Sequence, residues 1–396
     1  MRIAIIGAGA AGCFAAIEAK RHNPKAEVTI FESGPRPMAK LALTGGGRCN
    51  MTNSFASVRS LNEVYPRGYQ LMKRCLKVFG PDDCREWFEK LSIASFTQDD
   101  DRVFPVCQDA TLVVRAIERA LRQHKVDLIC NCRITSIRPG WTISSEVRDY
   151  PFDRVLVTTG GGAIKLLEQL ELQIETPTPS LFTLKVPDLG LNELSGISVP
   201  QVSLSLPGTS FKAKGALLLT DWGISGPATL RISSYAALHL ALKQYCCDLS
   251  INWLDTDQET ARQWCAARRQ KDARKMVSGT HPENLPERLW KHILAKAGLR
   301  GDLRWAEMGD KGLNRLCNAL TADIYPVCGR ARFKEEFVTA GGVSLKEIDP
   351  NTMQSRRYPG LFFAGEILDI DAITGGFNLQ AAWSTAFVAA AAVSEE

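Results

Sequence analysis

The chain has 396 residues, of which 45% are hydrophobic and 23% charged. This composition is that of an ordinary globular protein and excludes a disordered, collagenous or fibrous chain. The length corresponds to about two or three domains, so we expect more than one folding unit. Basic residues exceed acidic ones by 48 to 43, a small excess that can hide a strong local field.

Cysteine spacing and the longest apolar stretch bound the class further. The 12 cysteines are too sparse for a disulfide framework and form no C-x-x-C pair, so the sequence predicts no metal site. The apolar stretch at residues 379–393 is shorter than the ~20 residues of a membrane span and contains Gln380, Ser384 and Thr385. We therefore expect no membrane association and a cytoplasmic protein.

The N-terminal segment predicts a strand, a helix and a second strand. Residues 3–6 are a short apolar run, residues 13–21 a helix rich in small side chains, and residues 27–31 another strand. A G-x-G-x-x-G pattern that starts at Gly7 lies between the first strand and the helix. This order is typical of a dinucleotide-binding βαβ unit.

Each glycine of the pattern has a physical role. Gly7 permits the tight turn, Gly9 lets a diphosphate approach the backbone, and Gly12 lets the helix pack closely on the strand. The helix N-terminus favours the anion. Glu32, after the second strand, can hold a ribose hydroxyl and would repel a 2′-phosphate. The pattern therefore favours FAD or NAD over NADP.

Later apolar runs predict more strands, followed by a change of pattern. Strands are expected at residues 125–130 and 154–158, with a hairpin between them at 133–138 and 142–147. Prolines at 176–179 interrupt the pattern, as at a linker or domain edge.

The rest of the chain predicts alternating strands, then helices, then strands and a C-terminal helix, at residues 196–220, 255–320, 333 onward and 379 onward. The simplest organisation is one nucleotide-binding domain interrupted by an insert. Its three parts are a first FAD-binding segment, a basic insert and a second FAD-binding segment, at residues 1–189, 190–332 and 333–396.

Two further glycine turns distinguish FAD from NAD. Thr159, Gly160 and Gly161 follow the 154–158 strand, where flavoprotein folds return the chain to the cofactor. Gly365 and Glu366 follow the apolar run of residues 361–363 and are typical of a contact with the ribityl-phosphate arm. A simple NAD dehydrogenase needs neither turn, so the pattern favours FAD.

Six segments carry distinctive motifs: TGGGRCNMTN at 44–53, RVFPV at 102–106, TDWGISGP at 220–227, TAGGV at 339–343, GEILD at 365–369 and TGGFNLQ at 374–380. Together they resemble the BaiN/RdsA family of FAD-dependent, NAD(P)-linked oxidoreductases. The resemblance spans nearly the whole chain. It implies an α/β fold, with a Rossmann-like FAD-binding domain of the glutathione-reductase-like flavoprotein kind. An inserted domain, β-barrel-like and then helical, would interrupt it.

The resemblance also implies which residues bind FAD. The ADP half would lie on the first glycine turn, the diphosphate and flavin near the second, and the flavin ring and ribityl chain near the C-terminal turns. The expected set is Gly7, Gly9, Ala10, Ala11, Gly12, Glu32, Ser33, Lys40, Gly46, Gly47, Arg48, Cys49, Asn50, Thr159, Gly160, Gly161, Gly365, Glu366, Asp371, Gly376, Phe377, Asn378 and Leu379.

The residue types in the two glycine loops suit this role by themselves. Consecutive glycines let backbone N–H groups point at a ligand. Arg48 can neutralise phosphate, or form a structural salt bridge. Asn378 can contact the flavin, or cap the final helix. Because both loops would serve one flavin, we expect them to lie together.

Cys49 is the candidate catalytic residue, as a proton donor beside the flavin. The alternative is an inert buried thiol, which is the commoner role of a free cysteine. No second cysteine stands beside it at the spacing of a disulfide reductase.

The predicted insert carries a local basic excess. Residues 261–300 contain ten lysines and arginines and three acids, a balance that suits a phosphate backbone but is also found on solvated helix faces. The candidate RNA-binding residues are Arg262, Arg268, Arg269, Lys271, Arg274 and Lys275.

The leading hypothesis is an FAD enzyme that uses NAD(P)H to reduce a C=C bond. The family resemblance and the basic insert make uridine in 23S rRNA the first choice of substrate, with dihydrouridine as product. The alternatives are a steroid or bile-acid enone reductase, an amine oxidase, and a non-catalytic flavin-containing RNA-binding protein. The sequence leaves the oligomeric state open.

Overall fold

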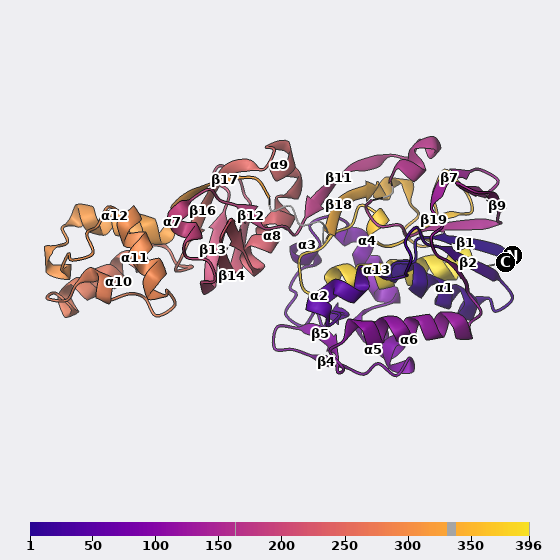
Figure 1. The fold of residues 1–396 in the computed structure, drawn as a ribbon, viewed down its shortest axis with the longest axis horizontal. Helices are drawn as coiled ribbons and strands as arrows, with labels where there is room; N and C mark the ends of the chain where they lie inside the picture. Colours follow the sequence, from indigo (N-terminus) through magenta and orange to yellow (C-terminus); the bar gives the residue numbers. More distant parts are fainter. Residues whose placement is uncertain (163, 331–337, 396) are drawn as a thin grey trace. The chain divides into compact units, whose positions relative to one another are not determined.

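The computed structural model describes residues 1–162, 164–330 and 338–395 and divides the chain into two compact units (Figure 1). Unit 1 comprises Met1–Thr178 and Val338–Glu396, and unit 2 is Pro179–Phe337. The boundary predicted at 189/190 falls inside unit 2, because Leu184 and Leu191 belong to that unit's hydrophobic core. The boundary predicted at 332/333 lies outside the described residues.

Unit 1 is built on a parallel sheet of the Rossmann type. The strand order is β19-β10-β1-β2-β6, and every pair is parallel. The strands are β1 (Arg2–Ile6), β2 (Glu27–Phe31), β6 (Asp127–Ile129), β10 (Arg154–Val157) and β19 (Leu361–Phe363). Their side chains are largely buried on both faces, as their continuous apolar runs predict.

Two helices from opposite ends of the chain pack together beside this sheet (Figure 1). Helix α1 (Ala10–His22) contacts α13 (Phe377–Val393), and the rings of Phe14 and Trp383 lie 5.6 Å apart. Thirteen residues of α13 are buried, because the helix is apolar on every side. The C-terminal segment therefore completes the N-terminal domain.

Smaller elements cover the rest of unit 1. The 133–147 hairpin is present as β7 (Ile134–Arg138) and β8 (Thr142–Ser145). The prolines of 176–179 lie in strand β11 (Ile174–Ser180), which pairs with β18 (Val338–Val343), so they form no irregular linker. The domain edge predicted there agrees with the unit boundary between Thr178 and Pro179. The other elements are β3 (Thr52–Asn53), α3 (Leu61–Val64), α4 (Tyr69–Val78), α5 (Pro81–Lys90), β4 (Ser95–Thr97), β5 (Arg102–Pro105), α6 (Ala110–Gln123) and β9 (Asp149–Pro151).

Unit 2 combines an almost closed antiparallel sheet with helices. The strand order is β12-β15-β14-β13-β16-β17. A bridge between Leu184 and Arg330, with Lys185 N donating to Gly329 O at 2.9 Å, nearly closes it. The predicted β-barrel-like and helical insert is therefore confirmed. The strands are β12 (Leu184–Lys185), β13 (Ser198–Ser205), β14 (Lys212–Thr220), β15 (Gly223–Ser225), β16 (Cys246–Asn252) and β17 (Asp323–Cys328).

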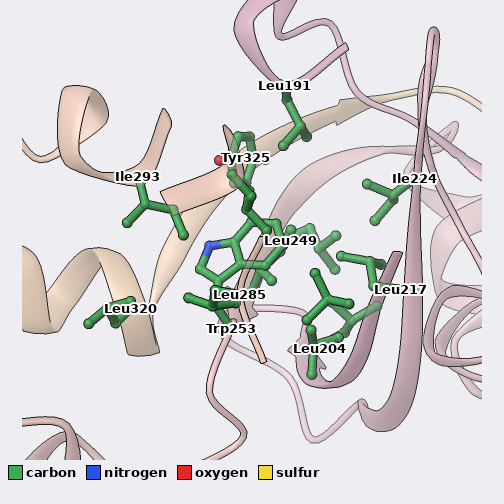
Figure 2. Packing of buried hydrophobic residues seen from close by; sticks show 14 of the residues in the cluster. Leu191, Leu204, Leu217, Ile224, Leu249, Trp253, Leu285, Ile293, Leu320 and Tyr325 are labelled. Atoms are coloured by element: carbon green, nitrogen blue, oxygen red, sulfur yellow. The ribbon is translucent and has the colours of Figure 1, made fainter. Parts of the chain in front are cut away.

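The core of unit 2 joins the sheet to its helices. Figure 2 shows Trp253 and Tyr325 between sheet residues such as Leu204 and helix residues such as Ile293. The helices are α7 (Leu189–Asn192), α8 (Pro227–Tyr235), α9 (Ala237–Leu242), α10 (Gln258–Lys271), α11 (Glu287–Lys296) and α12 (Asp310–Thr321). Among the described residues, none of the helices has both the length and the apolar character needed to cross a membrane.

Candidate cofactor site

The carboxyl ends of four parallel strands place the predicted glycine turns side by side. Thr158, after β10, donates its hydroxyl to Gly7 O, after β1, at 2.8 Å. A Cβ on Gly365, after β19, would lie 2.9 Å from the Ala11 side chain. Glu32 follows β2. Ligands of open α/β sheets bind at this edge.

The first turn has the geometry that its sequence pattern predicts. Gly7 has a φ of +104°, which favours glycine. A Cβ on Gly12 would lie 2.0 Å from Gly7 O, so only glycine lets α1 approach the strand. A Cβ on Gly9 would have no atom within 4 Å, so space is open beside this backbone.

Helix α1 presents free donors next to that space. Its first N–H groups are those of Ala10, Ala11 and Gly12, and the bond from Cys13 N to Gly9 O, at 3.1 Å, is the first to close a helical turn. The leading N–H groups of a helix have no intrahelical acceptor and attract anions. The turn therefore fits a diphosphate.

Glu32 holds its carboxylate against the same turn. One oxygen accepts from Ala8 N at 3.0 Å, and the other accepts from Gly34 N at 2.7 Å. The residue is partly exposed, and Ser33 beside it is exposed. A carboxylate fixed in this way can accept hydrogen bonds from a ribose diol, which fits FAD.

The second glycine loop also has a conformation that requires glycine. Gly45, Gly46 and Gly47 have φ values of +59°, +68° and +82°, and a Cβ on Gly46 or Gly47 would meet no atom within 4 Å. Arg48 donates to Gly45 O at 3.2 Å and its guanidinium lies 4.4 Å from the centroid of the Phe104 ring. These contacts hold the Arg48 side chain, which forms no salt bridge with the described residues.

Two asparagines clamp the second loop to the C-terminal turn. With its amide oriented to satisfy both neighbours, Asn50 donates to Thr52 O at 3.0 Å and accepts from Gly376 N at 2.9 Å. Asn53 donates to Gly375 O at 3.0 Å. A Cβ on Gly376 would lie 2.2 Å from Thr52 O. The two loops thus lie together, as expected from their shared role.

The start of α13 supplies a second set of backbone donors. Gly376, with a φ of +95°, is the N-cap, and Gln380 N makes the first turn's bond to Gly376 O at 3.0 Å. This leaves the N–H groups of Phe377, Asn378 and Leu379 without intrahelical acceptors. Backbone donors of this kind can stabilise a negative charge, such as the one that builds up on a flavin edge.

The side chains of this segment have other partners. Asn378 exchanges two hydrogen bonds with the Ala372 backbone, both at 2.9 Å, so it does not cap the helix as one alternative proposed. The buried Phe377 ring packs 5.0 Å from that of Phe55, centroid to centroid. Contact with a cofactor would therefore use the backbone here.

Glu366, in the turn after β19, contacts the residues around the Thr159–Gly161 turn after β10. Its carboxylate accepts from Thr339 N at 2.7 Å and lies 3.7 Å from the Lys40 ammonium. A Cβ on Gly160 would lie 3.3 Å from Glu366 Oε2, and a Cβ on Gly161 would clash with Thr339 at 2.4 Å. Thr159 and Gly160 are partly exposed.

Asp371, a predicted FAD-binding residue, is buried and paired with a side chain of the protein. Its side chain is 0% exposed, and both carboxylate oxygens accept from the Arg67 guanidinium. The pair is backed by a β-bridge between the two residues. Asp371 is therefore placed to shape the loop before Gly375.

Cys49 is also buried. Its side chain has 0% exposure, and burial raises the pKa of its thiol to about 12, against the opposing effect of the Thr44 hydroxyl. A group that lines a ligand site is normally exposed when no ligand covers it. The environment of Cys49 therefore favours the packing role over the proton donor.

Sequence reasoning missed the residues that support these loops. Arg67 lies outside every recognised segment, and nothing in its surroundings marks it. Asn53 and Gln380 lie within recognised segments, where an amide among glycines was a signal for loop clamping. Gln380 is buried and donates to Ser384 Oγ at 2.9 Å.

The predicted RNA-binding residues lie on and after α10 in unit 2. Arg268 and Lys275 pair with the buried Asp272 at 3.1 and 2.8 Å, and Arg269 pairs with Asp310 at 3.0 Å. Of the six predicted residues, Arg262, Lys271 and Arg274 are exposed and form no ion pair with the described residues. The local field is therefore weaker than the residue count predicts.

The parallel sheet, the glycine turns at its carboxyl edge and the carboxylate after β2 define a Rossmann-type oxidoreductase of the FAD-dependent class. A family model described as the HI0933-like protein Rossmann domain matches residues 1–392, and the chain belongs to this family. The resemblance to BaiN/RdsA proteins is thereby confirmed.

Curated relatives match over the full length. The 3-dehydro-bile acid delta(4,6)-reductase of Clostridium scindens is 28% identical, with 100% of this chain and 99% of the relative covered. The ribosomal RNA dihydrouridine synthase of Escherichia coli is 30% identical, with 98% of this chain and 96% of the relative covered.

A solved structure shows the same fold. The 3-ketosteroid-delta4-(5alpha)-dehydrogenase of Rhodococcus jostii RHA1 superposes with a TM-score of 0.53 at 12% identity, covering 100% of this chain and 96% of that one. The predicted α/β fold is therefore confirmed.

Proposed function

We propose that this protein is an FAD-dependent reductase that uses NAD(P)H to saturate a C=C bond, with uridine in 23S rRNA as substrate and dihydrouridine as product. The observation that carries the enzyme class is the convergence of the turns after β1, β10 and β19 at one edge of the sheet, with open space beside the Gly9 backbone. When bound, FAD supplies the hydride chemistry that amino-acid side chains lack.

The chain's own residues would bind and orient that cofactor. The N–H groups of α1 would hold the diphosphate, and Glu32 the ribose. The Gly46–Gly47 backbone would approach the diphosphate and flavin, with Arg48 nearby as a counter-charge. The first N–H groups of α13 would face the flavin ring. These roles follow from the open backbone at Gly9, Gly46 and Gly47.

The choice of RNA as substrate is supported by the 30% identical relative and by cations on α10. A uracil within folded RNA would have to be exposed to reach a flavin. A ribosomal RNA substrate would place the protein in the cytoplasm. No neighbouring side chain is assigned as proton donor.

The second candidate is reduction of a steroid enone, which the 28% identical bile-acid reductase favours. The decisive experiment maps dihydrouridine in 23S rRNA with and without the gene. We expect one uridine to lose the modification when the gene is deleted, and purified protein with FAD and NAD(P)H to restore it. Reoxidation of the reduced protein by a steroid enone but not by unmodified rRNA would favour the second candidate.

Replacing Cys49 by alanine is expected to leave uridine reduction within about threefold of wild type, because loss of a general acid typically costs about 100-fold or more. The pH profiles of the two proteins should coincide up to about pH 10, since the Cys49 thiol has a pKa of about 12 and keeps its proton below it. A drop beyond about 100-fold with FAD still bound would restore Cys49 as proton donor.

Replacing Arg262, Lys271 and Arg274 together by glutamine is expected to weaken RNA binding. The slope of log affinity against log salt should become shallower by roughly 0.7 for each lost contact with single-stranded phosphate. The matched control is Arg269→Gln, because Arg269 is neutralised by Asp310. Equal effects of both variants, measured by filter binding, would count against α10 as the RNA contact.

A further inference from the structure

The outer face of the unit 2 sheet carries two aligned rows of polar side chains. In the register of β13, β14 and β16, Ser203 lies opposite both Lys214 and Asn252. Ser205 lies opposite both Lys212 and Ser250. Each row therefore runs from a polar residue on β16 through a serine on β13 to a lysine on β14.

Strand alternation separates these rows from the core. Leu204 lies between the two serines in sequence and points among core side chains in Figure 2. Its partners Ala213 and Ile251 are buried as well. Neighbouring residues of a strand point to opposite faces, so the serines and lysines project outward.

The rows line an open cavity of about 520 Å³, which we call the groove. Its walls include Lys212, Lys214 and Arg231, together with serine hydroxyls, the Asn252 amide and Tyr235, and none of the lining residues is acidic. Hydroxyls and cations suit a phosphate better than an apolar ligand or a cation, and the carboxylate that contacts these side chains, that of Asp255, is not among the lining residues.

Local pairing leaves most of this positive charge available. Lys214 Nζ lies 2.8 Å from Asp255, which also accepts from Ser203. In the described part of the chain Lys212 has no acidic partner. Arg231 donates to Lys214 O at 3.1 Å, and its Nε has no acceptor among the described residues.

The shape of the site favours a phosphate chain over a single phosphate. Lys212 and Lys214 are two residues apart on one strand, which separates their Cα atoms by about 6.8 Å. Both project from the same sheet face, and the serine rows extend that face sideways. We infer that this groove binds the phosphodiester backbone of RNA. The choice of RNA rests on the proposed function, and the contact is separate from the one proposed for α10.

The test compares Lys212→Gln/Lys214→Gln with a control, Lys243→Gln/Lys311→Gln, which removes two exposed unit 2 lysines outside the groove. The probe is an unmodified 23S rRNA transcript, in filter binding from about 50 to 200 mM KCl. We expect the groove variant to raise Kd roughly fivefold and to lower the salt slope by about 0.7, the share of one lost contact at Lys212, because Asp255 neutralises Lys214. The control should do neither.

Further readouts separate this inference from the proposed function. Unchanged Kd in the groove variant, equal losses in the control, or an altered KM for NADPH with unchanged RNA binding would each overturn it. Dihydrouridine formation by wild type is measured separately. If that reaction is absent but the groove variant alone loses RNA binding, the groove stands and the proposed function fails. Matching Tm values would exclude unfolding as the cause.

Discussion

The Gly12→Ala and Gly9→Ala variants are expected to lose FAD binding for different reasons. A Cβ on Gly12 would lie 2.0 Å from Gly7 O, and a backbone carbonyl can withdraw only if strand and helix separate. We expect a loss of about 3 kcal/mol or more in the free energy of unfolding, at the upper end for overpacked sites. FAD binding should be lost with it, because the turn that holds the diphosphate would be displaced.

A Cβ on Gly9 would meet no protein atom within 4 Å, so the Gly9→Ala variant should fold with the wild-type Tm when FAD is removed. The added methyl would occupy the space that the diphosphate needs. We expect FAD affinity to fall at least tenfold, about 1.4 kcal/mol. Flavin fluorescence titration and thermal unfolding of the FAD-free proteins measure both effects. Wild-type FAD affinity in Gly9→Ala would show that the diphosphate lies elsewhere.

The elements that sequence predicts well are those fixed by local physics. The first βαβ unit follows from two apolar runs, a glycine turn and a helix of small side chains within one short segment. The glycine triplet at 45–47 likewise has positive φ at every position, which few other residues adopt. In both cases the residue type alone restricts the backbone.

The hydrogen-bond and ion-pair partners of individual side chains could not be predicted in this way. Asn378 has the composition of an N-cap, but Gly376 takes that position and the Asn378 amide binds Ala372. The basic count on α10 overlooked Asp310, which lies outside the counted stretch and pairs with Arg269. The conformation of the loop before α13 decided the first case, and a contact between two segments decided the second.

The Arg67–Asp371 pair is the clearest example of a partner that the sequence does not reveal. Its loss is expected to cause a large fall in stability and in FAD affinity. The side chains are 14% and 0% exposed, so Arg67→Met would leave a buried carboxylate without its main counter-charge. Breaking a buried pair on one side costs about 3–5 kcal/mol. The loop that leads to Gly375 should loosen, and FAD affinity should fall with stability.

The matched control is Arg138→Met, which breaks the exposed pair with Asp149, where both side chains are about half exposed, at 52% and 55%. Such surface pairs contribute about 1 kcal/mol or less.

The double variant Arg67→Met/Asp371→Leu separates a charge effect from a packing effect. If the unpaired carboxylate causes the loss, an apolar pair should recover most of the stability of Arg67→Met. Urea unfolding of the wild type and the two variants measures the recovery. A double variant as unstable as Arg67→Met would show that the geometry of the Arg67 hydrogen bonds, rather than charge neutralisation, shapes the loop before the flavin turn.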